Sequence, residues 1–517
     1  MAFDIPGPRP QQDVGHVTEQ LDPFQAPPIS LMADVEKSTT LPHESETSID
    51  RFEVTFDGTA DSANPLNWST RTKWTVTSVL AITGFNNIMV STIVAPAITS
   101  ISKELHMSSM EPYMAYSIYA LATAFGPLLI GPLSEIHGRQ RVLHASNTWF
   151  LGWNIVCGFA HNKSLLIASR FLAGFGASAI FALSGGVLGD IWTPEDRGRS
   201  LGVYLLLPLF AAAVGPIIGG FIDQYTTWRW MFWATSIFQA FMSLVSCFAY
   251  HETYVPLILG RRASKLRKET GDARYHTVYE RLDSKHSSAM LIYHAMTRPL
   301  RLLAFHPIIQ ITSLIYAFWY GTLYIVLSSF STLWTSQYGE SVSTSGLHYI
   351  ACALGEMVGA QLGGPLMDWL YRYMVNRSPD KKHRPEFRIP LTYPGGLLAP
   401  LGLFIYGWTS HYRVHWIAVD IGVFVFMAAG QVNGMPLQAY IIDAYPDHVS
   451  SALAASQFLR SLTAFLFPLF VPSMYSTLGY GWGNSLLGFA GLFFGLPAPA
   501  ILWYWGVRLR EREKWSR

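Results

Sequence analysis

We single out three ionisable side chains inside long apolar runs, where charge is unusual: Arg170, Glu356 and Asp420. Glu356 lies about 12 residues into its run, or ~18 Å along a helix that rises 1.5 Å per residue, which places it near the middle of a ~30 Å bilayer core. A charged side chain there costs at least ~2.5–3.5 kcal/mol on insertion scales, so such residues usually serve proton or substrate binding. We therefore expect these three residues to carry proton coupling.

Each of the three also has a structural alternative. Arg170 follows the start of its run closely enough to extend its charged group to the outer interface. Glu356 can serve as a hydrogen-bonded link to a neighbouring helix. Asp420 is shallower, so water from outside can reach it. The sequence leaves these alternatives open.

Aromatic and amide side chains are the candidates for binding a substrate. Tyr316, Tyr320 and Tyr324 are spaced four apart and therefore share one face of a helix. Rings that carry hydroxyl groups accept bulky, partly polar or cationic ligands, although an interior helix packed on its neighbours has the same pattern. Three amides in the apolar runs are possible polar contacts: Asn87, Gln431 and Asn433.

The apolar runs that hold these residues predict an all-α membrane protein. Half of the 517 residues are apolar and only 14% are charged, which is too few charges for a soluble protein of this size. Twelve runs are long enough to cross a bilayer. They cover residues 74–98, 113–132, 142–160, 164–191, 200–222, 229–250, 306–330, 344–370, 391–409, 414–442, 451–475 and 482–507.

The runs group into two sets of six. We expect a disordered cytosolic tail over 1–63, a first bundle over 64–250, a basic cytosolic connector over 251–305, a second bundle over 306–507 and a cytosolic tail over 508–517. Lys and Arg concentrate in the tails, the connector and alternate loops, which places both termini in the cytosol. No cysteine or histidine cluster has metal-ligand spacing, and there is no Walker loop for ATP.

A charged turn follows the second run and has a counterpart in the second set. The segment from Gly131 to Arg141 contains Glu135, Gly138 and Arg139, and the segment from Gly364 to Arg372 repeats its Gly-Pro-Leu opening, with Asp368 as the acid and Arg372 as the base. We expect these residues to form a gating latch. The expected partners of the first turn are Glu195, Asp196, Arg197 and Arg199, and in the second half Asp443 is expected to pair with Arg460.

The motif Gly-x-Leu-Ser-Glu-x-x-Gly-Arg-x-Arg of the first turn resembles the loop signature between spans two and three of the major facilitator superfamily. The run Arg170–Ala177 resembles the superfamily's span 4 motif, whose arginine is associated with proton coupling. Gly215-Pro216-Ile217-Ile218-Gly219-Gly220 resembles the motif that separates antiporters from symporters, although it also fits a plain packing face of small residues. The box Pro65–Trp68 and the ends of the connector resemble the fungal drug:proton antiporters with twelve spans.

This resemblance implies the major facilitator fold, two pseudo-symmetric six-helix bundles with twelve transmembrane helices. It implies a proton-driven antiporter, with no cofactor, that exports amphipathic small molecules such as drugs, toxins or fungal secondary metabolites. We expect no enzyme activity and no nucleic-acid partner, and we expect a monomer in the plasma membrane or, alternatively, the vacuolar membrane. A polyamine or organic cation exporter and a non-transporting membrane sensor are the alternatives.

Overall fold

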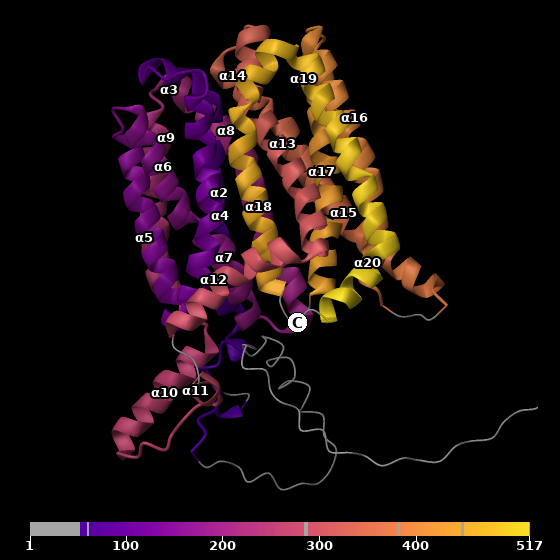
Figure 1. Ribbon diagram of the computed structural model, residues 1–517. Coiled ribbons are helices and arrows are strands. Elements are labelled where there is room, and N and C mark those ends of the chain that lie inside the picture. The colour runs from indigo at the N-terminus through magenta and orange to yellow at the C-terminus, as the bar shows by residue number, and fades with distance from the viewer. Residues whose placement is uncertain (1–51, 59–60, 284–287, 380–382, 446–448, 516–517) are drawn as a thin grey trace, which may run out of the picture. The chain divides into compact units, whose positions relative to one another are not determined.

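The computed structural model describes residues 52–58, 61–283, 288–379, 383–445 and 449–515, and these form helices (Figure 1). The first half contains α2 (Thr70–Thr92), α3 (Ile98–Glu104), α4 (Glu111–His137), α5 (Arg139–Gly158), α6 (Lys163–Ala177), α7 (Ala179–Ile191), α8 (Pro194–Tyr225) and α9 (Arg229–Ala249). Helices α6 and α7 together form the predicted fourth span. Within the described residues, the β-structure consists of one isolated bridge, between Glu53 and His276.

The second half repeats this plan. It contains α13 (Pro307–Gln337), α14 (Val342–Leu347), α15 (Tyr349–Arg377), α16 (Thr392–His411), α17 (Trp416–Ala444), α18 (Val449–Leu469), α19 (Val471–Gly495) and α20 (Pro497–Trp515). Helix α19 is broken at Gly479, whose φ of 66° is one that glycine adopts without strain. The break separates the eleventh predicted span from the twelfth.

Eleven helical segments of the described chain are long and apolar enough to cross a membrane. Helix α5, the predicted third span, is too polar for that criterion, yet it has 20 residues and packs beside α6 and α9. Asn154 explains part of its polarity, because its Nδ2 donates to the Oγ1 of Thr235 at 3.0 Å and the Oγ of Ser236 at 2.9 Å, both on α9. A helix therefore stands at each of the twelve predicted ranges, and the prediction of an all-α membrane protein is confirmed.

The connector forms three helices, α10 (Val255–Thr270), α11 (Val278–Asp283) and α12 (Ser288–Phe305). Part of the segment predicted as a disordered tail binds to it. The N–H of Val54 donates to the carbonyl of His276 at 2.8 Å, and Arg262 forms ion pairs with Asp57 and, at 2.7 Å, with Asp61. Backbone N–H groups of residues 57 and 63, together with Arg262, lower the pKa of Asp61. The rest of the predicted tail, residues 1–51 and 59–60, lies outside the described residues.

The two halves pack against each other through equivalent helices: the second span of each half contacts the fifth span of the other. Helix α4 is the second span of the first half, and it packs on α18, the fifth span of the second half. Helix α8 is the fifth span of the first half, and it packs on α14 and α15, which form the second span of the second half. The Ser117 hydroxyl donates to the carbonyl of Phe465 at 3.1 Å, and the hydroxyls of Thr123 and Ser461 are 2.9 Å apart. This reciprocal pairing is what a two-fold pseudo-symmetry between the halves produces.

Candidate transport site between the two halves

A ladder of tyrosine rings runs along α13 and reaches the first half of the chain. Ring centroids of Tyr316 and Tyr320 are 6.5 Å apart, those of Tyr320 and Tyr324 are 5.2 Å apart, and Tyr324 lies 6.0 Å from Tyr116 on α4. The shared face predicted from the spacing of four is therefore present. Tyr316 and Tyr320 are half-buried, whereas Tyr324 and Tyr116 are buried. The ladder thus has an accessible end and an enclosed end.

Arg460 of α18 lies over the accessible end of this ladder. Its guanidinium carbon is 4.5 Å from the Tyr320 ring centroid and 5.1 Å from that of Tyr316, and its Nη1 donates to the Tyr316 hydroxyl at 2.7 Å. The expectation that Asp443 pairs with Arg460 is wrong, because Asp443 accepts from the Nε of Arg388 at 2.5 Å. Sequence reasoning gave Arg460 a role at the gate, and the structure places it beside the tyrosines.

Glu356 of α15 is buried, with 9% of its surface exposed. Among the described residues, it has no hydrogen-bond or ion-pair partner, although its charge acts on the hydroxyl of Tyr320. The glycines beside Glu356 let its helix pack closely on a neighbouring helix. A Cβ on Gly355 would lie 2.6 Å from the carbonyl oxygen of Phe424, and Gly359 abuts Ala428 in the same way, so α15 packs tightly on α17. A structural role as a hydrogen-bonded link gains no support from these contacts.

Arg170 is fully buried in α6, so it does not extend to an interface. Its Nε donates to the carbonyl of Ala115 at 2.6 Å and its Nη2 to that of Tyr116 at 3.3 Å. The guanidinium also faces the rings of Tyr119, at 5.4 Å, and Phe232, at 5.7 Å. Arg170 therefore holds the stretch of α4 that carries the last ring of the ladder.

Asp420 lies in a separate cluster around His348, at the junction of α14 and α15. The Nδ1 of His348 is 2.8 Å from an Asp420 carboxylate oxygen, and its Nε2 is 3.0 Å from a carboxylate oxygen of Glu340. The imidazole stacks on Trp334 with ring centroids 3.7 Å apart. Sequence analysis missed His348 and Glu340, because the cluster joins a loop residue, a helix end and Asp420 of α17, which have no common spacing in the sequence.

The three amides predicted to bind substrate are not gathered at the tyrosine ladder. Asn87 is buried and its Nδ2 donates to the carbonyl of Ala177 at 3.3 Å. Asn433 is buried and donates to the carbonyl of Thr392 at 3.1 Å. Both amides link neighbouring helices. Gln431 is half-buried on α17 and has no hydrogen bond to a described residue.

The first gating turn is centred on Gly138. Its φ of 93° ends α4, and α5 starts at Arg139. Gly131 lies inside α4, where a Cβ would meet nothing within 4 Å, so it does not form the turn. The Nε of Arg139 donates to Asp190 at 2.5 Å, and its backbone N–H donates to Glu252 at 2.9 Å. The partner of Arg139 is thus Asp190 of α7.

Of the other residues of the predicted latch, Glu135 interacts electrostatically with Arg139. Glu135, Arg141 and Asp196 are exposed. The remaining expected partners lie outside the described side chains: Glu195, Arg197 and Arg199. In the second half, Arg388 joins Asp443 and, at 3.9 Å, Asp368. Arg372 donates to the carbonyl of Asp368 in its own helix, at 3.3 Å.

The glycines of the span 5 motif lie at close contacts. A Cβ on Gly215 would lie 2.9 Å from the carbonyl oxygen of Met89, and one on Gly219 would clash with the carbonyl of Ile93, so both glycines face α2. Gly220 faces α14, since its Cβ would lie 2.8 Å from the carbonyl oxygen of Val342. The carbonyl of Pro216 would lie 3.0 Å from a Cβ on Gly346 of α14. The motif therefore joins α8 both to its own half and to the other half.

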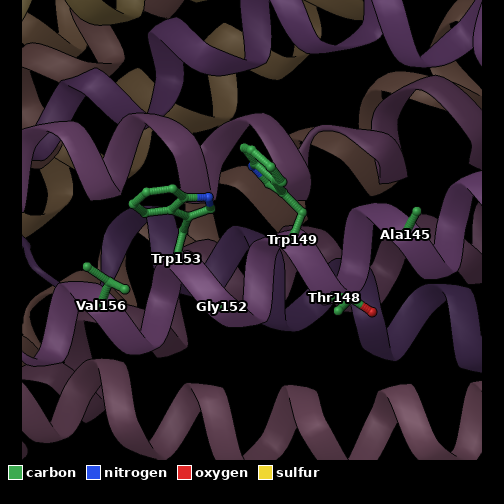
Figure 2. A pocket seen from close by; sticks show the side chains of 6 residues that line it. All are labelled: Ala145, Thr148, Trp149, Gly152, Trp153 and Val156. Carbon is green, nitrogen blue, oxygen red and sulfur yellow. The ribbon is translucent and has the colours of Figure 1, made fainter.

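A hollow of about 620 Å³ lies on α5. Figure 2 shows the side chains that line it. Trp149 is 45% exposed, so the hollow lies at the outer surface of the helix, and its lining shares no residue with the tyrosine ladder. The lining residues are Ala145, Thr148, Trp149, Gly152, Trp153 and Val156. We assign this hollow no part in the transport site.

Two linked halves of membrane-length helices, with polar aromatic residues where they meet, define a membrane transporter rather than an enzyme. The family model described as the Major Facilitator Superfamily matches residues 80–468, and the chain belongs to this superfamily. It is a multi-pass membrane protein.

Curated relatives and solved structures agree with this assignment. The chain is 53% identical over 422 residues to a probable efflux pump, mfs2, of Aspergillus flavus, covering 82% of this chain and 99% of the relative. It is 40% identical over 465 residues to the efflux pump vrtL of Penicillium aethiopicum, covering 90% and 91%. A bacterial homologue of the lysosomal transporter Spinster, solved in an inward-facing conformation, has the same fold with a TM-score of 0.62 at 15% identity, covering 86% of this chain and 99% of that structure.

Proposed function

We propose that this protein exports amphipathic, aromatic small molecules in exchange for protons. The observation that carries the proposal is the tyrosine ladder, which crosses from α13 to α4 and has Arg460 and Glu356 at its side. Rings and hydroxyls from both halves offer a ligand contacts that change when the halves move relative to each other. The outward direction is supported by two fungal relatives that are described as efflux pumps.

Two groups are suited to carry the proton. Glu356 is a buried carboxylate beside the ladder, where it can take up and release a proton during the transport cycle. His348 lies between Asp420 and Glu340, and a protonated ring can donate to both carboxylates whereas a neutral ring can donate to only one. We propose that protons entering from outside favour the state that releases substrate outward.

The proposal includes the oligomeric state, the membrane and the energy source. The protein acts as a monomer in the plasma membrane with both termini in the cytosol, or alternatively in the vacuolar membrane. Its energy comes from the proton gradient, with no cofactor.

The test is the sensitivity of a fungal strain that lacks the chain, compared with one that expresses it, to a panel of drugs and toxins. We expect expression to raise resistance to aromatic amphipathic compounds and to lower their accumulation, and we expect a protonophore to remove the difference. Equal sensitivity and equal accumulation across the panel would contradict the proposal. They would favour the alternative of a non-transporting sensor.

A second candidate function is the export of polyamines or other organic cations, because Glu356 is a carboxylate without a described partner. Glu356→Gln separates the two candidates. If cations are the natural substrates, this variant loses spermidine export and keeps the export of uncharged aromatic drugs. If Glu356 carries the proton, both activities fall together.

A further inference from the structure

Arg460 differs in its neighbours from three arginines that form ion pairs. Arg139 pairs with Asp190, Arg388 with Asp443, and in the outer loops Arg229 pairs with Glu104, each at 2.5 Å. Within the described residues, Arg460 has no carboxylate partner; its neighbours are two tyrosines and an amide. A membrane-embedded cation without an anion is costly, so an unfilled partner position is a sign of function.

Arg460 has hydrogen-bonding capacity to spare. A guanidinium carries five N–H groups in a planar fork. Nη1 donates to the Tyr316 hydroxyl at 2.7 Å and Nη2 donates to the Oε1 of Gln457, while Nε is buried without a partner. The neighbours fix the guanidinium in place and leave donors available for a ligand.

The side chain is also accessible, in contrast to the other unpaired arginine of the interior. Arg170 is fully buried and is enclosed by the carbonyls of Ala115 and Tyr116. Arg460, like Tyr316 and Tyr320 beside it, is half-buried, so part of its surface is accessible.

The positive charge of Arg460 and the two tyrosine rings beside it indicate the chemical class of the ligand. A guanidinium fork matches the two oxygens of a carboxylate and binds it more strongly than a point charge does. The rings of Tyr316 and Tyr320 lie within 5.1 Å and 4.5 Å of the same guanidinium, so an aromatic body attached to the anionic group would stack there. We propose that Arg460 binds the negatively charged group of the transported substrate, which is an aromatic carboxylate or phenolate.

This inference rests on the proposed export function, and it is tested with two xanthene dyes of opposite charge. The purified full-length protein in lipid nanodiscs is titrated against fluorescein, an anion, and rhodamine 6G, a cation, with fluorescence anisotropy as the readout. We expect the protein to bind fluorescein, and Arg460→Gln to weaken that binding by roughly tenfold or more, because it removes one partner of a desolvated charge pair. Arg460→Lys keeps the charge but loses the forked guanidinium, so its affinity for fluorescein should lie between that of the parent and that of Arg460→Gln.

The control is Arg71→Gln, which makes the same change in net charge at an exposed position on α2 and should bind as the parent does. Retained binding of rhodamine 6G by Arg460→Gln shows that the variant is folded. The inference is overturned if the parent does not bind fluorescein, or if Arg460→Gln binds it as the parent does. If the parent still exports rhodamine 6G in a protonophore-sensitive way, only the anion site fails, whereas loss of all export would remove the proposed function itself.

Discussion

His348 holds one carboxylate on each of its ring nitrogens, and it joins α14, which contacts the first half of the chain, to α17 through Asp420. Its ring stacks on Trp334 and is 9% exposed, so few water molecules reach it. The other ionisable groups around this cluster are Tyr338, Arg413 and Cys352, which interact electrostatically with its carboxylates or with one another. A titration of His348 therefore changes how α14 is held.

We expect His348→Gln to flatten the pH dependence of transport between about pH 5.5 and 8, the range in which histidine titrates. Glutamine keeps a donor and an acceptor at this position but cannot take up a proton. The measurement is the initial rate of dye export against pH for the parent, His348→Gln and the exposed control His137→Gln. An unchanged pH profile in His348→Gln would show that the proton is carried elsewhere, with Glu356 as the next residue to test.

The hydrogen bonds of Arg170 to backbone carbonyls lead to a prediction about the stability of the protein. Arg170→Lys keeps a charge but loses the geometry that serves two carbonyls, so we expect a loss of about 1–3 kcal/mol in the free energy of unfolding and a lower thermal midpoint. Arg71→Lys, at an exposed position, is the matched control. If both variants melt at the parent's temperature, Arg170 does not anchor α4.

At this scale, prediction from sequence succeeded where one helix carries the whole pattern. The tyrosine face of α13 followed from spacing, whereas the sequence left the burial of Arg170 open and the structure decided it. Prediction failed where partners come from separate helices. The pairs His348–Asp420, Arg139–Asp190 and Arg388–Asp443 join residues far apart in the chain, and hydropathy holds no information about which helices are neighbours.

At the scale of the element, the glycines of α8 set the distance between helices. Gly215 and Gly219 have no side chain between α8 and the backbone of α2, and Gly220 serves the contact with α14 in the same way. The sequence motif predicted close packing on one helix face. The structure adds a second face, which belongs to the other half of the chain.

We expect Gly219→Val to lower export strongly and to reduce the amount of folded protein, because its Cβ would clash with the carbonyl of Ile93 and push α8 away from α2. Gly202→Val is the matched control, since the same substitution on the same helix meets nothing within 4 Å. Export assays and size-exclusion profiles of the two variants test this prediction. Equal losses in both would mean that helix propensity, and not the contact with α2, explains the effect.

The positions of the helices followed from hydropathy, although α13 and α15 end at Gln337 and Arg377, beyond the predicted ends at 330 and 370. Two other features also departed from expectation. Helix α5 is more polar than a typical span, because Asn154 and other polar residues face neighbouring helices instead of lipid. Residues 52–58 and 61–63, assigned to a disordered tail on composition, bind the connector through Arg262 and the backbone of His276. Composition describes the average character of a segment, and a few specific contacts were enough to order these residues.

At the scale of the whole molecule, the contacts between the halves decide which state is populated. The Thr123–Ser461 hydrogen bond joins α4 to α18, and the Ser343 N–H donates to the Gln224 side chain at 2.8 Å between α14 and α8. Transport by alternating access requires such contacts to form and break in each cycle.

We expect a disulfide between Thr123→Cys and Ser461→Cys to stop export, because it would hold α4 against α18. The native hydroxyl oxygens are 2.9 Å apart, which places the two side chains in contact. Oxidation should abolish dye efflux from cells, a reductant should restore it, and each single variant should be insensitive to both treatments. Full export by the crosslinked pair would show that these helices stay together throughout the cycle.

The central claim is that a proton gradient drives the export of an aromatic substrate through the site between the halves. The direct measurement is uptake of a fluorescent aromatic dye into proteoliposomes that contain the purified protein, with a pH gradient imposed across the membrane and molecules in both orientations. We expect accumulation in acidic vesicles that collapses on addition of a protonophore and is lost in Glu356→Gln or His348→Gln. Accumulation of equal size with and without the gradient would contradict it.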